Sequence, residues 1–224
     1  LRMPTIEVKE TAGVRAADLV SIHIDDKELC RRFSARVLRD VKVAPTPAWM
    51  VDRLRGAGIR SINNVVDVTN FVMLELGQPL HAYDYDRIAG HTLTARRAHA
   101  GEQLHTLDDS NRIAVGDELV IADSEKPAGL AGIMGGLDSE VTDQTTTVVL
   151  EAASFHGPTI RRTARRIGLR SEASGRFERG VDETETIRAV TRAAQLLTEM
   201  DACTVAEGAI DVNPAPRVPT VLTF

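Results

Sequence analysis

The chain has 224 residues, of which 43% are hydrophobic and 26% charged, so it is long enough for one large or two small globular domains. The net charge of −5 argues against a general nucleic-acid coat protein, although a local basic patch remains compatible with it. Two distant cysteines outside any CxxC pair argue against a disulfide framework or a zinc site, and no signal peptide or run of about 18 apolar residues indicates export or membrane insertion.

The first half of the chain predicts one strand followed by two helices. Residues 1–28 are acidic and have no firm period. Residues 33–43 alternate apolar and polar side chains, which predicts a half-buried strand. Thr46 as the N-cap and Pro47 as the first helical residue predict a short helix, and apolar residues at helical spacing predict another over 62–76.

The second half predicts a sheet region followed by two further helices. Short apolar runs between turn residues over 91–150, ending with TTTVVLEAA, predict a compact antiparallel sheet. The segments GPTIRRTARRIGLR and DETETIRAVTRAAQLLTEM predict helices, the second with acidic residues in its first turn. A last strand, CTVAEGAIDV, precedes a proline-rich exit, and the closing PRVPTVLTF predicts the start of another strand. Because helices and strands are segregated along the chain, the fold class is predicted to be α+β.

Two stretches could shape a polar pocket. Thr69 and Asn70 are adjacent on a mostly apolar helix, and His81 follows shortly after its end. These side chains either satisfy local backbone groups or line a pocket. The segment GLAGIMGG, at 129–136, has neither a dinucleotide-binding pattern nor a P-loop, so its glycines predict close approach of the backbone to another strand or to a ligand.

Two charged features also have two interpretations each. Glu151 ends an apolar, β-branched run, and a buried carboxylate needs a partner, which is either an arginine or a ligand. The chain also carries Arg161 and Arg165, and Arg162 and Arg166, as pairs four residues apart. Like charges at that spacing are mildly destabilising unless acidic side chains or an RNA backbone lie opposite them.

Several long blocks resemble, in the same order, the central region of the β subunit of bacterial phenylalanyl-tRNA synthetases. These blocks are APTPAWMVDRLRGAGIRSINNVVDVTNFVMLELGQPLHAYDYDRI, LVIADSEKPAGLAGIMGG, VVLEAASF and IRRTARRIGLRSEASGRFERGVD. The resemblance implies an α+β editing domain with an antiparallel or mixed sheet core flanked by several helices. It implies a flank at 1–28, the editing domain at 29–205 and a flank at 206–224 leading to the next module of a longer subunit.

The resemblance also implies a site, residue by residue. The residues implied to act on the ester and the attacking water are Arg60, Thr69, Asn70 and His81. The residues implied to bind the substrate side chain are Gly135, Glu151, Ser171 and Ala173. Relatives commonly have threonine at position 171, so serine keeps the hydroxyl and leaves a slightly roomier pocket. The candidates for RNA contact are Arg161, Arg162, Arg165 and Arg166.

In that family the module hydrolyses tyrosine wrongly esterified to phenylalanine tRNA. The resemblance therefore implies tRNA and the α subunit, in a cytoplasmic heterotetramer, as partners, with no membrane association. Editing is expected to need no metal or cofactor, whereas ATP and Mg²⁺ belong to aminoacylation on the other subunit. Two alternatives are a non-catalytic module that binds RNA or a partner subunit, and a free-standing deacylase of the same fold.

Overall fold

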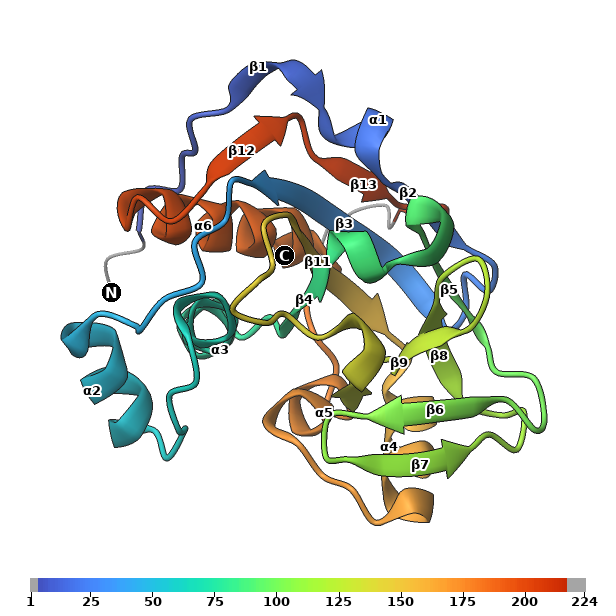
Figure 1. Cartoon of the computed structure of the whole chain (residues 1–224). Helices are drawn as coiled ribbons and strands as arrows, with labels where there is room; N and C mark the ends of the chain where they lie inside the picture. Colours follow the sequence, from blue (N-terminus) through green and yellow to red (C-terminus); the bar gives the residue numbers. More distant parts are fainter. Residues whose placement is uncertain (1–3, 217–224) are drawn as a thin grey trace, which may run out of the picture.

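The computed structural model describes residues 4–216, and it has two sheets packed face to face with helices around them (Figure 1). The expected strand in PRVPTVLTF lies almost wholly outside the described residues. No helix of the described part combines the length and the apolar character needed to cross a membrane.

The central sheet has six strands, and most of its pairs are antiparallel. Its order is β1-β12-β3-β11-β4, with β13 also paired to β3. The strands are β1 (Thr11–Arg15), β3 (Cys30–Arg39), β4 (Leu80–Asp84), β11 (Val148–Phe155), β12 (Thr204–Glu207) and β13 (Ile210–Val212). Only β1, which pairs with β12, runs parallel to its neighbour.

The second sheet has the order β10-β9-β8-β5-β2. Its strands are β2 (Ser21–Ile24), β5 (Thr92–Arg97), β8 (Leu119–Ala122), β9 (Pro127–Leu130) and β10 (Met134–Gly135). A separate hairpin is made by β6 (Gln103–Thr106) and β7 (Ser110–Ile113). The β1 and β2 strands lie in the segment 1–28, so this segment contributes to both sheets.

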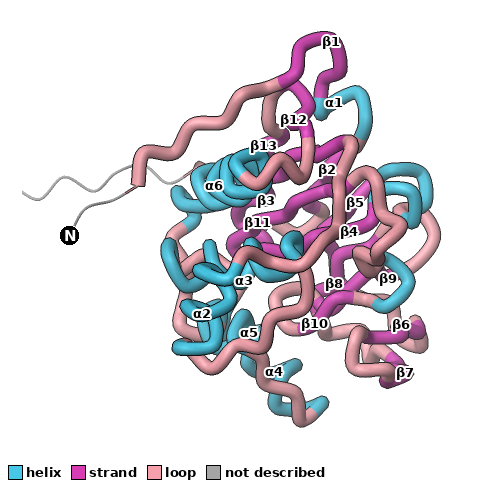
Figure 2. Tube along the Cα trace, turned by 60° about the vertical axis from the view of Figure 1, so that its left-hand side comes forward, coloured by secondary structure: helices cyan, strands magenta, loops and turns pink. Residues whose placement is uncertain are grey.

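The helices over residues 64–76 and 186–199 cover the other face of the central sheet, whereas those over 157–167 and 172–177 pack with the core between the two sheets. The helices are α1 (Ala16–Leu19), α2 (Ala48–Gly56), α3 (Asn64–Leu76), α4 (Gly157–Ile167), α5 (Glu172–Phe177) and α6 (Thr186–Glu199). Short 3-10 turns are η1 (Tyr85–Arg87), η2 (Ala89–His91), η3 (Leu137–Ser139) and η4 (Glu183–Glu185). Figure 2 shows α3 and α6 together on one side of the strands.

Alternate residues of each central strand enter different cores. Val149 and Ala153 of β11 pack with Ile121 of the second sheet, whereas Val148 and Leu150 pack with the helices α3 and α6. Because side chains alternate across a strand, odd-numbered residues of β11 face the second sheet and even-numbered ones face the helices. This alternation decides which side chains can meet between the two sheets.

The structure confirms the α+β class and corrects several predicted elements. The strand predicted at 33–43 to be half-buried runs instead from Cys30 to Arg39 and is covered on both faces. Its polar positions Ser34 and Arg36 face α6, where they bond the hydroxyls of Thr186 and Thr191 at 2.8 and 3.1 Å. The run TTTVVLEAA, predicted to belong to the 91–150 sheet, supplies β11 of the central sheet instead.

Helix termini differ by small shifts with identifiable causes. Thr46 does not cap α2, because its hydroxyl donates to Asp67 Oδ2 at 2.6 Å and Pro47 takes the capping position. The second helix begins at Asn64 rather than 62, because the Asn63 side chain accepts from the Val66 amide at 2.9 Å. The acidic residues predicted for the first turn of the last helix form η4 just before α6.

Candidate active site between the two sheets

Three polar side chains lie on the face of the central sheet that meets the second sheet. The β4 and β11 strands pair in a register that sets Glu151 opposite His81, and Tyr83 opposite Val149. Because residues two apart on a strand share a face, His81, Tyr83 and Glu151 face the second sheet together. Two strands far apart in the sequence thus bring an imidazole, a phenol and a carboxyl into one place.

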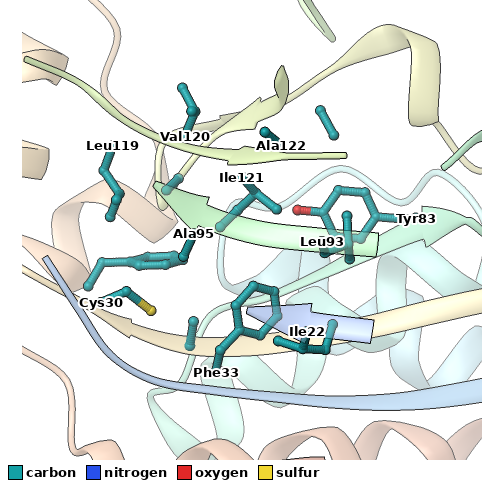
Figure 3. Packing of buried hydrophobic residues seen from close by; sticks show 14 of the residues in the cluster. Ile22, Cys30, Phe33, Tyr83, Leu93, Ala95, Leu119, Val120, Ile121 and Ala122 are labelled. Carbon is teal, nitrogen blue, oxygen red and sulfur yellow. The ribbon is translucent and has the colours of Figure 1, made fainter. Parts of the chain in front are cut away.

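These side chains open onto a small cavity of about 80 Å³. The lining is mostly apolar and comes from the strand β4, the second sheet, β11 and α5. The lining residues are Pro79, Leu80, His81, Tyr83, Ile121, Gly129, Leu130, Ala131, Gly132, Ile133, Met134, Gly135, Glu151, Phe155, Ala173 and Phe177. Figure 3 shows the Tyr83 ring among Leu93 and Ile121 of the second sheet, in the core beside this cavity.

Glu151 is a buried carboxyl whose partner is a tyrosine. The Tyr83 hydroxyl donates to Glu151 Oε2 at 2.5 Å, and both residues are almost fully buried. Burial raises the pKa of Glu151 to about 7, although the hydrogen bond from Tyr83 offsets part of this rise. The predicted alternative of an arginine partner is wrong, because no described arginine pairs with this carboxyl. Within the described chain, the other oxygen, Oε1, accepts no hydrogen bond.

His81 presents an imidazole nitrogen without a partner. Its Nε2 is buried and makes no hydrogen bond to a described residue. The ring stands edge-on to Tyr83, with the ring centres 4.4 Å apart. Burial lowers the pKa of His81 to about 4, so the imidazole is neutral at physiological pH and Nε2 can act as a hydrogen-bond acceptor.

The glycines of 129–136 bring the edge of the second sheet against His81. A Cβ at Gly135 would lie 2.7 Å from His81 Nε2, and one at Gly136 would lie 2.5 Å from the carbonyl oxygen of Ala128. Contacts this short leave no room for a side chain. The close approach predicted for this segment is therefore made here to another strand and to the imidazole.

The α5 helix supplies the last side of the cavity. Ala173 lines it, and Ser171 caps the helix by accepting from the Ser174 amide at 3.1 Å. The Ser171 hydroxyl also donates to the carbonyl of Ile133 at 2.9 Å. Ser171 thus ties α5 to the glycine-rich segment without itself lining the cavity.

Arg60, Thr69 and Asn70 do not line this cavity in the described structure. Thr69 lies on α3, whose apolar residues pack against the opposite face of the central sheet, and its hydroxyl donates to the carbonyl of Val66 at 2.7 Å. Asn70 lies on the same helix, and Arg60 lies in the loop before it, in a surface groove with Arg55. Of the eight implied site residues, the fold brings His81, Gly135, Glu151 and Ala173 together around the cavity.

Tyr83 is the site residue that the sequence analysis missed. It lies two positions after His81 in the segment HAYD, which is the spacing of side chains on the same face of a strand. This spacing indicates a shared face only if the segment is a strand, and no strand was predicted between the helix at 62–76 and the sheet region at 91–150.

The arginines of α4 divide into two kinds. Arg162 pairs with Asp117 at 3.4 Å, and Arg166 pairs with the buried carboxylate of Glu118. Arg161 and Arg165 are exposed, and neither has an ion pair among the described residues. The salt-bridge interpretation therefore holds for two of the four arginines, and the other two remain available for an anionic partner.

Comparison with known proteins agrees with this architecture. Residues 29–202 match the family model described as the B3/4 domain. The chain belongs to the B3/4 domain family. It is 49% identical over 98% of its length to the phenylalanine–tRNA ligase β subunit of Symbiobacterium thermophilum, and 48% identical over its whole length to that of Nitratidesulfovibrio vulgaris. The resemblance found in the sequence is thereby confirmed.

This B3/4 chain spans 25% and 28% of the length of those two relatives. Among solved structures, it is similar to an N-terminal fragment of the phenylalanyl-tRNA synthetase β subunit from Pyrococcus horikoshii, with a TM-score of 0.55 and 13% identity. That match covers 93% of this chain and 56% of the other, and at this identity it concerns the fold alone.

Proposed function

We propose that the chain is the editing module of a phenylalanine–tRNA ligase β subunit, and that it hydrolyses the ester between tyrosine and phenylalanine tRNA. The observation that carries the proposal is the Glu151 carboxyl, which lies beside a mostly apolar cavity and has one oxygen that bonds no residue from 4 to 216. The curated relatives are phenylalanine–tRNA ligase β subunits, which supports the same context.

The cavity chemistry suits discrimination between tyrosine and phenylalanine. The two amino acids differ by one hydroxyl, and an apolar synthetic pocket rejects an added hydroxyl only about 100-fold. A second site that hydrogen-bonds the hydroxyl selects in the opposite sense, since phenylalanine leaves its acceptor unpaired at a cost of about 1–3 kcal/mol. Ile121 and Phe155 would contact the aromatic ring, and Glu151 Oε1 would accept from the hydroxyl.

Hydrolysis would proceed by direct attack of water. No serine, threonine or cysteine is among the described residues that line the cavity. An aminoacyl ester is already activated, so correct positioning of water provides much of the rate. His81 Nε2 would accept a hydrogen bond from that water or from the substrate amino group. With a pKa of about 4, His81 is a weak base, and its proposed role is mainly orientation.

The remaining implied residues would act around the cavity. Arg60, Thr69 and Asn70 are proposed to contact the part of the ester that lies outside it. Gly135, Ala173 and Ser171 would shape the pocket. The exposed Arg161 and Arg165 would bind tRNA phosphates. In the complete ligase, the α subunit would be the partner that carries aminoacylation with ATP and Mg²⁺, and the module itself would need no cofactor.

The first test is hydrolysis of tyrosyl-tRNA and phenylalanyl-tRNA by the chain, and by the two-subunit ligase that contains it. Glu151→Ala and His81→Ala are compared with Glu172→Ala, which changes an exposed acid outside the cavity. We expect selective loss of tyrosine by the wild type and the control, and its collapse in the two site variants.

Other outcomes separate the alternatives. Selectivity that survives Glu151→Ala would remove the recognition role of this residue. Tyrosyl-tRNA that is bound but hydrolysed in neither preparation would point to a non-catalytic RNA-binding module. Gel filtration with the α subunit distinguishes a free-standing deacylase, which should not associate with it.

A further inference from the structure

Within residues 4–216, one hydrogen bond holds the carboxyl of Glu151. Tyr83 donates to its Oε2 at 2.5 Å, across two strands that are 68 residues apart in the sequence. The Tyr83 ring is itself fixed, since it stands edge-on to His81 and packs in the core with Leu93 and Ile121 (Figure 3). A buried ring with such neighbours cannot swing away, so its hydroxyl is held at a defined point.

The surroundings of Glu151 offer no second anchor in the described chain. The titratable groups that face it are His81 and Tyr83 on β4 and Cys30 on β3, and burial keeps the Cys30 thiol protonated. The elements across the cavity contribute only apolar side chains and glycines, from β8, β9, β10 and α5. The rotation of the carboxyl about its last bond is therefore restrained by the hydrogen bond to Tyr83.

We propose that Tyr83 is a positioning residue that determines specificity: by holding Oε2, it keeps Oε1 of Glu151 turned to the cavity as the acceptor for the substrate hydroxyl. This inference rests on the proposed function. Without the Tyr83 hydroxyl, the carboxyl would be free to rotate and to present either oxygen in several directions. A flexible acceptor loses part of its advantage, because ordering it on binding costs entropy.

The same hydrogen bond affects the charge of the acceptor. Burial raises the pKa of Glu151, and donation from Tyr83 opposes the rise because it favours the ionised form. If the ionised carboxylate is the better acceptor, hydrolysis of the tyrosyl ester increases with pH through the Glu151 pKa of about 7. Loss of the Tyr83 hydroxyl raises that pKa, so the increase moves to higher pH.

The test is Tyr83→Phe, which removes one oxygen and keeps the ring. Hydrolysis of tyrosyl-tRNA and phenylalanyl-tRNA is measured from about pH 6 to pH 9. At about pH 7 we expect kcat/KM for the tyrosyl ester to fall about tenfold or more, mainly through KM, with little change for the phenylalanyl ester. The midpoint of the pH profile should move to higher pH.

A matched control is available in the only other tyrosine. Tyr85 donates its hydroxyl to the carbonyl of Leu19 at 3.1 Å and does not line the cavity. Tyr85→Phe should leave both the preference for the tyrosyl ester and the pH profile unchanged.

Titration of the Glu151 carboxyl carbon by NMR gives a second readout that does not need hydrolysis. Its midpoint should be higher in Tyr83→Phe than in the wild type. The role of Tyr83 would be overturned if Tyr83→Phe changed neither the Glu151 titration midpoint nor the preference for the tyrosyl ester. If Glu151→Gln still lost that preference, the proposed function would stand. A wild type that does not distinguish the two esters would overturn both.

Discussion

Glu151 and His81 stand opposite each other on neighbouring strands, yet burial moves their pKa values in opposite directions. Burial disfavours the charged form of each group, so the pKa of Glu151 rises to about 7 and that of His81 falls to about 4. Near neutral pH the carboxyl is about half ionised while the imidazole is uncharged. The two groups therefore do not form an ion pair, and both remain available to a polar ligand.

Replacing Glu151 should stabilise the fold in a pH-dependent way. The pKa of Glu151 is about 7 in the folded chain and 4.5 in the unfolded chain, so the folded state holds its proton more tightly. The free energy of unfolding therefore decreases as pH rises from about 4.5 to about 7. Glu151→Gln cannot ionise. We expect little effect at about pH 4 and a gain approaching 3 kcal/mol at about pH 8, measured by urea unfolding.

Glu102→Gln is a control for which the expected change in the free energy of unfolding has the opposite sign. Hydrogen bonds from Arg96 lower the pKa of Glu102, so its contribution is present above the unfolded pKa and Glu102→Gln should destabilise the chain at about pH 8. If the gain in the free energy of unfolding from Glu151→Gln did not change with pH, ionisation of the buried carboxyl would not be its cause.

His81 should stay neutral at pH values well below those at which an ordinary histidine is protonated. NMR titration of its ring should give a midpoint of about 4, compared with 6.5 for an unperturbed side chain. As pH falls, the His81 imidazole is protonated at a higher pH in the unfolded chain than in the folded one. The free energy of unfolding should therefore decrease as pH falls from about 6.5 to about 4. A ring midpoint near 6.5 would mean that His81 reaches solvent in solution.

At the scale of one residue, the burial of Glu151 agrees with its apolar sequence context, whereas its hydrogen-bond partner, Tyr83, was neither of the two partners considered from the sequence, an arginine or a ligand. The apolar run around Glu151 predicts a buried strand from local information. The partner comes from β4, and no local pattern records which strands will pair. The pairing of β4 with β11 sets His81 opposite Glu151 and brings the hydroxyl of Tyr83, two residues further along β4, within hydrogen-bonding distance of the carboxyl.

At the scale of the elements, the edge strand β10 approaches the imidazole of His81 closely because its second residue, Gly135, has no side chain. Gly135→Ala would place a methyl group 2.7 Å from Nε2, so the ring must move. Overpacking of this kind costs about 1–3 kcal/mol. We expect a loss of tyrosyl-ester hydrolysis that persists at temperatures where the variant remains folded.

Gly56→Ala provides the comparison. A Cβ at this position meets no atom within 4 Å, and its backbone conformation is not of the kind that favours glycine. Stability and hydrolysis should both be retained. Full activity of Gly135→Ala would show that the contact with His81 is not needed for the reaction.

Helices were predicted more accurately than the way in which they pack. The expected helix at 62–76 differs from α3 by two residues, because apolar periodicity and the turn at Gly77 are local signals. Which face of the sheet α3 covers depends on its contacts with β4 and α6. The resemblance implied a site role for Thr69 and Asn70, whereas α3 packs against the face of the central sheet opposite to the cavity.

At the scale of the whole molecule, the acidic chain leaves a small basic surface on α4. Replacing Arg161 and Arg165 together by glutamine should weaken tRNA binding and flatten its dependence on salt. For two lost phosphate contacts, the slope of log K against log salt should decrease by roughly 1.5. Binding titrations at several salt concentrations measure this slope.

The neighbouring pair supplies the control with the same change in charge. Arg162 and Arg166 are engaged by Asp117 and Glu118, so replacing them should lower stability more than it changes the slope. Equal slopes for the two double variants would contradict a specific role for Arg161 and Arg165.

The edge position of β4 has a consequence for how this module can change through evolution. Among the described strands β4 pairs only with β11, and its residues alternate between the cavity and the helices. Insertion or deletion of one residue in the turn from Gly77 to Pro79 could shift this register by one. Such a shift would turn His81 and Tyr83 toward α3 and put Ala82 at the cavity, in a chain that still folds. Lineages that keep the activity should therefore vary the residues of this turn but not its length.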